Sequence, residues 1–285
     1  MARQGYAYGV DLRRSRWLAG STVGNALVRA VDRAWPTLAE HLEAEVLCEA
    51  LGDDPTTLGL LRELAAHMNL LRAPLPTVKR LRSEQRGRWP LVTPLGATRG
   101  GALWLILDVD ALVALAPDQR AFLLGAALGH LHCDHAVFFS AHLLANRREG
   151  NLQIRALQSA MIPWTKVMAF SADRAGLIAC GRLETAVAVI ENPPIPVGSQ
   201  PEPQMRWLPE LPAPAVRVRA LEEFARSAVF ARVTAMRARQ RELARNVTLL
   251  DPAPSGDEAD RVHVPADAWS LARVDARLTA RLNLV

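Results

Sequence analysis

The sequence predicts an α+β protein that is mainly helical and has one small antiparallel sheet. Apolar residues recur every three or four positions over most of the chain, which is typical of amphipathic helices. Only residues 77–107 show short alternating or apolar segments, and Gly96, Gly100 and Gly101 separate the last two of them. Hydrophobic residues make up 50% of the 285-residue chain, which is enough for a sizeable core and excludes wholesale disorder.

Capping residues and breakers mark the elements of the first half of the chain. Residues 1–35 are expected to be irregular because four glycines interrupt them. Thr37 can cap a helix, and Asp54-Pro55 opens the next one, which ends before Pro74. The elements expected up to residue 115 are helices 37–51 and 54–73, strands 77–83, 89–93 and 102–107, and one or two helical turns at 110–115.

Helices also dominate the second half of the chain. Pro117-Asp118 begins a long one. The expected elements are helices 117–146, 164–191, 215–245 and 266–282, with loops at the proline-rich residues 192–214 and at 251–265. On the last helix Arg273, Arg277 and Arg281 form a ridge, interpreted as a solvated face, with an anion or partner site as the alternative. The expected units are an irregular N-terminal segment (1–36), a main domain (37–245) and a C-terminal loop and helix (246–285).

Composition excludes several functional classes. The 34 basic and 29 acidic side chains leave a net charge of +5 spread along the chain, and aromatic residues are sparse, which argues against nucleic-acid binding. No apolar run approaches the ~20 residues that a membrane helix needs, so no membrane span is expected. Three cysteines and no secretory signal point to the cytoplasm. Arginine in place of lysine, together with abundant alanine, indicates a GC-rich bacterial genome.

A histidine-rich segment, Phe122–His135, carries the most chemical information. It resembles the zinc-binding helix of the gluzincin metallopeptidases related to HtpX and the CAAX prenyl endopeptidases, where the usual run is LGHELGHI with another His a few residues later. Aligned without gaps, the second His of that run falls on His130 and the later one on His135. The first His falls on Ala126 and the Glu on Ala127.

Flanking segments extend the resemblance over about residues 40–230. Residues 105–120 resemble the strand, short helix and helix start that precede the zinc helix of the family. Residues 169–176 resemble an E-x-x-x-D-R-x-G stretch whose Glu is the third zinc ligand. That Glu position is Ala169 here, and the positions that match are Asp173, Arg174 and Gly176.

A fourth segment lies further along the chain. Residues 211–217 resemble the family's H-P-x-x-x-x-R, with Leu211 in the His position and Arg217 retained. The four segments follow one another in the family's order. The resemblance therefore implies the fold of this peptidase family around one former zinc site.

The chemistry of the family motif shows what the departures mean. Two imidazoles at positions i and i+4 share a zinc ion with a carboxylate from a later helix, and the Glu beside the first His takes a proton from the zinc-bound water. This chain keeps His130 alone among the three ligand positions, and Ala127 replaces the general base. We therefore expect no zinc at the family site, no other cofactor and no catalytic residue. A protein that keeps the fold of a peptidase without its reaction is a pseudopeptidase.

Alanine stands at three positions where the family has a zinc ligand or the general base, namely 126, 127 and 169, and two explanations account for this. With about one Ala in six residues, their joint occurrence by chance is roughly a one-in-200 event. Either small residues were favoured once the ligands were lost, or the protein was deliberately inactivated. Leu211 and the additional His132 favour natural divergence, since inactivation does not need them.

The remaining polar residues allow an alternative zinc site. This rewired set is drawn from one short stretch: His130, His132, Cys133, Asp134 and His135. The favoured interpretation is that these residues are hydrogen-bonded remnants, and Cys133 would need a lowered pKa and a positioned base to act as a nucleophile.

Three remnants of the later motifs also have structural interpretations. Asp173 is expected to anchor His130. Arg174 and Arg217 are expected to pair with buried acids such as Glu222, with binding of a carboxylate as the alternative.

The sequence therefore predicts a catalytically inactive, metallopeptidase-like protein that binds a peptide or protein. Substrate binding and chemistry use different parts of such a site, and the strand around residues 102–107 is expected to be an edge that accepts an extended peptide. Two alternatives stay open at this point: an active metal-dependent endopeptidase with the rewired metal site, and a structural subunit that docks through its arginine-rich C-terminal helices.

Overall fold

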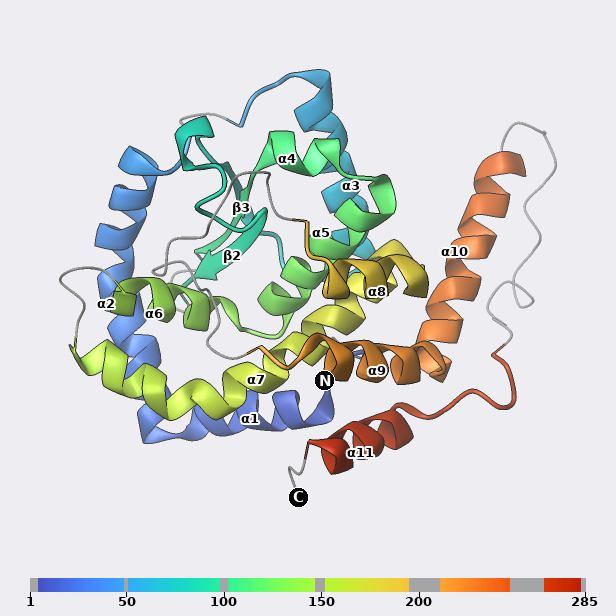
Figure 1. Ribbon diagram of the computed structural model, residues 1–285. Helices are drawn as coiled ribbons and strands as arrows, with labels where there is room; N and C mark the ends of the chain where they lie inside the picture. Colours follow the sequence, from blue (N-terminus) through green and yellow to red (C-terminus); the bar gives the residue numbers. More distant parts are fainter. Residues whose placement is uncertain are drawn as a thin grey trace.

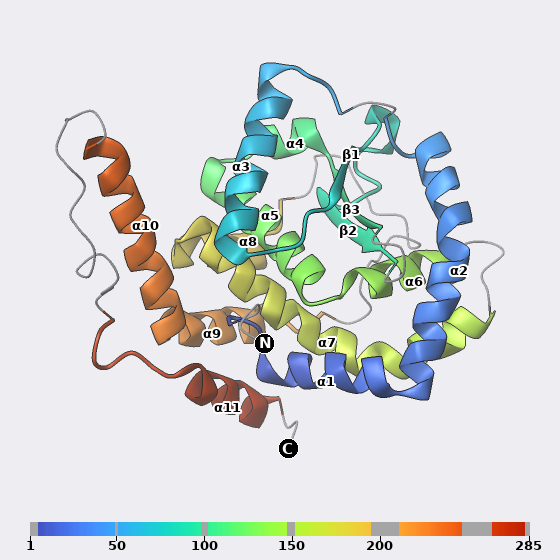
Figure 2. The ribbon, with the colours of Figure 1, turned by 180° about the vertical axis from the view of Figure 1, so that it is seen from behind.

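The computed structural model describes residues 5–48, 51–97, 102–146, 152–194, 211–246 and 264–282 (Figure 1). The predicted class is confirmed: helices surround one small sheet, and α5 and α7 cross the middle of the molecule (Figures 1 and 2). The helices are α1 Gly9–Gly20, α2 Thr22–Glu45, α3 Pro55–Leu71, α4 Val109–Ala114, α5 Pro117–His132, α6 Ala136–Asn146, α7 Leu152–Cys180, α8 Leu183–Glu191, α9 Pro214–Ala225, α10 Ala228–Asn246 and α11 Leu271–Arg281. The strands are β1 Thr77–Arg80, β2 Val92–Gly96 and β3 Leu103–Leu107.

The sheet has the order β1-β3-β2, so β3 is its central strand. β2 pairs with β3 antiparallel, from Val92 opposite Leu107 to Gly96 opposite Leu103. β1 pairs with β3 parallel, which makes the sheet mixed and the prediction of a wholly antiparallel sheet wrong. Alternation in a sequence marks a strand, but the direction of pairing depends on whether the connection turns back at the same end of the sheet or crosses to the opposite end.

The N-terminal residues 9–36 are helical, which corrects the expectation of an irregular segment. Ser21 caps α2 by accepting a hydrogen bond from the Gly24 N–H. The helix then runs through Pro36, which lies on its exposed side, and the expected boundary between residues 36 and 37 falls inside it. Its opposite side buries a stripe at helical spacing, namely Leu27, Val31, Trp35, Leu38 and Leu42. Burial of this stripe outweighs the hydrogen bond that the proline removes.

Three expected long helices are each broken. The chain bends by 91° between α5 and α6, where Asp134 has a φ of 61°. Gly181, with a φ of 73°, separates α7 from α8. A turn at Arg226 and Ser227 separates α9 from α10. The starts of α3 and α5 at Pro55 and Pro117 agree with the prediction.

No described helix is by itself long and apolar enough to cross a membrane. In the part of the chain that the structure describes, one pair of helices, α5 and α6, reaches the length and composition of a membrane span when the two are joined, and the 91° bend lies between them.

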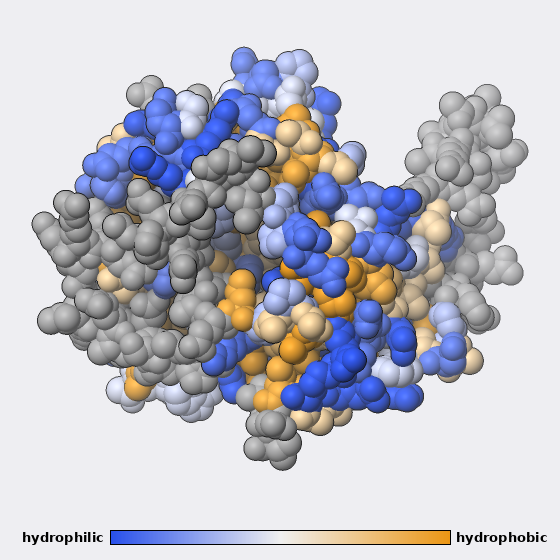
Figure 3. All heavy atoms as spheres, in the orientation of Figure 1, coloured by the Kyte–Doolittle hydropathy of each residue, from blue (hydrophilic) through white to orange (hydrophobic). Residues whose placement is uncertain are grey.

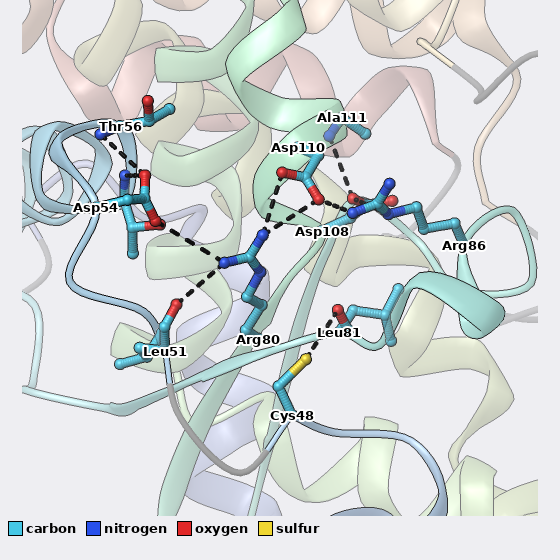
Figure 4. A network of polar contacts seen from close by, with 11 residues as sticks. Cys48, Leu51, Asp54, Thr56, Arg80, Leu81, Arg86, Asp108, Asp110 and Ala111 are labelled. Carbon is cyan, nitrogen blue, oxygen red and sulfur yellow. Dashed lines mark hydrogen bonds and ion pairs between the residues drawn. The ribbon is translucent and has the colours of Figure 1, made fainter.

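An ion-pair network ties β1 to the starts of α3 and α4 (Figure 4). Arg80 lies 3.2 Å from the Asp110 carboxylate and 4.0 Å from that of Asp54, and donates to the Leu51 carbonyl. Arg86 pairs with Asp110 and with the buried Asp108. Since most of these side chains are partly exposed, each pair adds at most about 1 kcal/mol, and the network mainly sets the position of these three elements.

Glycines bring α5 and α7 into close contact. A Cβ on Gly125 would overlap the Ala179 Cβ and lie 2.9 Å from the Ala175 carbonyl oxygen. A Cβ on Gly129 would lie 2.6 Å from the Ala175 Cβ. The two helix backbones can therefore approach only because neither position carries a side chain.

Replacing Gly125 by Val is expected to destabilise the fold, because the new methyl groups meet helix backbone that cannot move aside. We expect a loss of at least about 3 kcal/mol in the free energy of unfolding, measured by urea denaturation. The control is Gly59→Ala on α3, where nothing lies within 4 Å of the added Cβ. That change should raise stability by roughly 0.5–1 kcal/mol through helix propensity. Equal changes in the free energy of unfolding for Gly125→Val and Gly59→Ala would contradict the close contact between α5 and α7.

Candidate functional site

A cavity of about 520 Å³ opens between the β2 edge of the sheet and helices α5 and α7. Its wall is mainly apolar and includes residues 87–94, the end of α8 and the start of α9. Figure 3 shows hydrophobic side chains exposed in the middle of the face seen in Figure 1. An elongated apolar ligand suits such a cavity better than a highly charged one.

The positions that match the zinc ligands of the peptidase family converge on this cavity. Ala126, His130 and Ala169 all line it, as do Ala127 and Asp173. Ala126 and His130 are four residues apart on α5, as are Ala169 and Asp173 on α7, so each pair lies on one helix face. The contact through Gly125 and Gly129 then turns the two faces toward the same space. Ala126, His130 and Ala169 therefore face one cavity, which is the arrangement that the resemblance implies for the ligand positions.

The side chains present do not fit the zinc ion that the resemblance implies. Alanine has no donor atom, so positions 126 and 169 supply none and position 127 supplies no base. His130 supplies one imidazole nitrogen, whereas a catalytic zinc site needs three protein ligands. Leu211, the position matched to the His of the H-P-x-x-x-x-R stretch, also lines the wall.

His130 belongs to a chain of hydrogen bonds that leads away from the cavity. Its Nδ1 lies 3.0 Å from His135 Nδ1, and His135 Nε2 lies 3.1 Å from Asp11 Oδ1. A carboxylate only accepts, so His135 Nε2 donates to Asp11. The two Nδ1 atoms share one hydrogen bond, and the tautomers of the rings decide which of them donates. Burial, His135 and Arg217 together hold the pKa of His130 well below its usual value. The ring of His130 is therefore neutral.

Asp173 does not anchor His130, which corrects the prediction. Its carboxylate accepts from Arg217 Nε at 2.9 Å and from Arg217 Nη2 at 2.7 Å, a bidentate pair at the cavity wall. Burial disfavours the charge on Arg217, but Asp173 outweighs it and raises the pKa of the guanidinium. The predicted pairing of Arg217 with a buried acid is confirmed, although the acid is Asp173 and not Glu222.

Arg174 is also paired, but away from the cavity. It is fully buried, lies 2.8 Å from the carboxylate of Asp275 on α11 and donates to the Tyr6 carbonyl. Glu222 is the partner of neither arginine.

The arginine ridge of α11 is only partly solvated. Arg277 and Arg281 bond to the buried Glu223, at 2.9 and 2.7 Å. Burial opposes ionisation of Glu223, but these hydrogen bonds outweigh it and lower the pKa of the carboxyl group. Arg273 and Arg277 lie over the Trp269 ring. The ridge therefore joins α11 to α9 rather than forming a separate anion site.

The expected rewired cluster is divided in the structure. Asp134 is exposed, and His132 Nδ1 lies 3.0 Å from the Tyr6 hydroxyl. His130 faces the cavity, whereas Cys133 and His135 turn inward toward Asp11. Sequence reasoning missed Asp11 because it lies more than a hundred residues away, in a segment expected to be irregular.

No protein-family model, curated protein or solved structure matches this chain.

Proposed function

We propose that this protein is a catalytically inactive, metallopeptidase-like protein that binds an extended polypeptide in the cavity beside β2. The observation that carries the proposal is the convergence of Ala126, His130 and Ala169 on a cavity bordered by a strand edge. In this proposal the cavity and the strand edge hold the peptide, whereas the metal ligands and the general base needed to cleave it are missing. The sequence also predicts a cytoplasmic location and a polypeptide partner, and both predictions are part of this proposal.

The edge that can receive a peptide is β2, which replaces the strand expected from the sequence. The strand at 103–107 is central and already paired on both sides. Ala97 donates to the Ala102 carbonyl and Asp108 to the Leu91 carbonyl, so the odd-numbered residues of the β2 segment bond to β3. The backbone groups of its even-numbered residues point the other way.

Three even-numbered residues therefore determine what this edge offers. Ser140 Oγ accepts from the Gly96 N–H at 2.9 Å and donates to the Gly96 carbonyl at 2.8 Å, which closes that end. Val92 and Pro94 line the cavity. Val92 offers an N–H and a C=O, and Pro94 offers only a C=O because proline lacks the N–H. A short extended peptide can thus form a few backbone hydrogen bonds here while its side chains enter the apolar cavity.

The test is binding of a fluorescein-labelled library of extended apolar peptides, followed by fluorescence anisotropy. Ala126→Trp fills the cavity and should weaken binding at least tenfold, about 1.4 kcal/mol. Ala114→Trp, on the exposed side of α4, is the matched control and should bind as the unmodified chain does. N-methylation of alternate backbone amides in the peptide should also weaken binding, because the edge then loses its partners.

Two results would overturn this function. One is peptide binding that is changed neither by Ala126→Trp nor by N-methylation of the peptide. The peptide would then bind outside the cavity beside β2. The other is cleavage of the bound peptide or of casein that a chelator abolishes, which would support the active endopeptidase.

A further inference from the structure

Asp11, Cys133 and His135 form a cluster of three potential ligands outside the cavity. A carboxylate oxygen, the Cys133 sulfur and an imidazole nitrogen all lie within 4.8 Å of one another. The three side chains are at most 1% exposed. None of them lines the cavity beside β2.

The backbone at the α5–α6 bend places two of these ligands together. Asp134, between them, adopts a φ of 61°, a conformation that costs a residue with a side chain about 1–2 kcal/mol. This turn lets Cys133 and His135 both point inward while Asp134 stays exposed. Asp11 reaches the same point from the first turn of α1.

The hydrogen bonds around the cluster orient it. His135 Nε2 faces Asp11 Oδ1 at 3.1 Å, while Nδ1 is held by His130. Ser171 on α7 donates to Asp11 Oδ2 at 2.5 Å, so a hydroxyl oxygen lies beside the three ligands. A histidine ligand commonly has its second nitrogen held in this way, which keeps the ring in position.

We propose that Asp11, Cys133 and His135 bind one zinc-class divalent ion that fastens α1 to the bend between α5 and α6. One sulfur, one nitrogen and one oxygen are the ligand types that zinc and cobalt accept in tetrahedral sites, with the Ser171 hydroxyl or a water molecule as the fourth ligand. Because the site is closed and separate from the cavity, the ion is structural and gives the protein no peptidase activity.

Protons balance in this step. The Cys133 thiol releases one proton to solvent as the sulfur–metal bond forms. His135 Nε2 becomes a ligand, so the ring carries its proton on Nδ1 and donates it to His130 Nδ1. The proton of His130 then lies on Nε2, so each neutral imidazole keeps one proton.

The test is titration of the full chain with Co²⁺, followed by absorption of the thiolate-to-cobalt transition in the near ultraviolet. We expect one equivalent of Co²⁺, displaced by Zn²⁺, and a rise in the melting temperature. Cys133→Ala should abolish the band, whereas Cys48→Ala and Cys180→Ala, at the two other cysteines, should keep it. Asp11→Asn should weaken Co²⁺ binding at least tenfold with Cys133 still present. Circular dichroism identifies any variant that fails to fold.

Ala126→Trp separates this site from the cavity and keeps all three proposed ligands. Cobalt binding that survives in this variant while peptide binding is lost supports two independent sites. Absence of a thiolate band in the unmodified, folded chain would overturn the metal site and leave the peptide-binding proposal standing. A band that Cys133→Ala does not remove, or that Ala126→Trp removes, would overturn it as well.

Discussion

A zinc site is expected to form in the cavity when Ala126 is replaced by His and Ala169 by Glu. Positions 126 and 169 and His130 line the same space, and the neutral ring of His130 can offer a nitrogen to a metal ion. We expect affinity to rise from negligible to submicromolar, a change of at least about 4 kcal/mol. The measurement is competition with a chromogenic chelator in a Cys133→Ala background, which removes the buried cluster as a second binding site.

The single Ala126→His variant is the control, because two imidazoles without the carboxylate should bind zinc far more weakly. Hydrolysis of a peptide should require Ala127→Glu in addition, since zinc polarises the water but a base must take its proton. If the double variant binds zinc no more tightly than the Cys133→Ala background does, then the helices α5 and α7 do not present these positions as the family does. In that case the structural-subunit alternative would gain weight over peptide binding.

Replacing Arg174 by Met is expected to be among the most destabilising single substitutions in this chain. Its guanidinium is buried between the rings of Tyr8 and Phe224, at 5.5 and 5.0 Å from their centroids. It pairs with Asp275, which is only 19% exposed and belongs to α11. Removing the cation leaves that carboxylate without its partner at the contact between α11 and the N-terminal segment. We expect a loss of about 3–5 kcal/mol in urea denaturation.

The matched control for this prediction is Arg182→Met. Arg182 pairs with Asp118 at 2.9 Å, but both side chains are well exposed, so its loss should cost at most about 1 kcal/mol. The double variant Arg174→Met/Asp275→Asn should recover part of the loss because the unpaired charge is removed as well. A cost for Arg174→Met no larger than that for Arg182→Met would show that the buried pair contributes little.

Local chemistry in the sequence determined where several elements begin and which residues share a face. Asp54-Pro55 and Pro117 start α3 and α5 as predicted, because a cap or an N-terminal proline acts within one helical turn. Helical spacing was also sufficient to place Ala126 with His130 and Ala169 with Asp173. The expectation that they share one site came from the family resemblance, and the packing of α5 against α7 brings them to one cavity.

Only the tertiary structure decided how distant segments meet. Contacts between residues far apart in the chain decide the parallel pairing of β1, the break at Asp134 and the passage of α2 through Pro36. Such contacts also decide the partners of Arg174, Arg217 and Glu223. Asp11 is the clearest case, since no local pattern connects it with Cys133 and His135. A proline in a helix or a left-handed aspartate persists only where the packing of neighbouring elements compensates its cost, and a sequence read locally does not contain those neighbours.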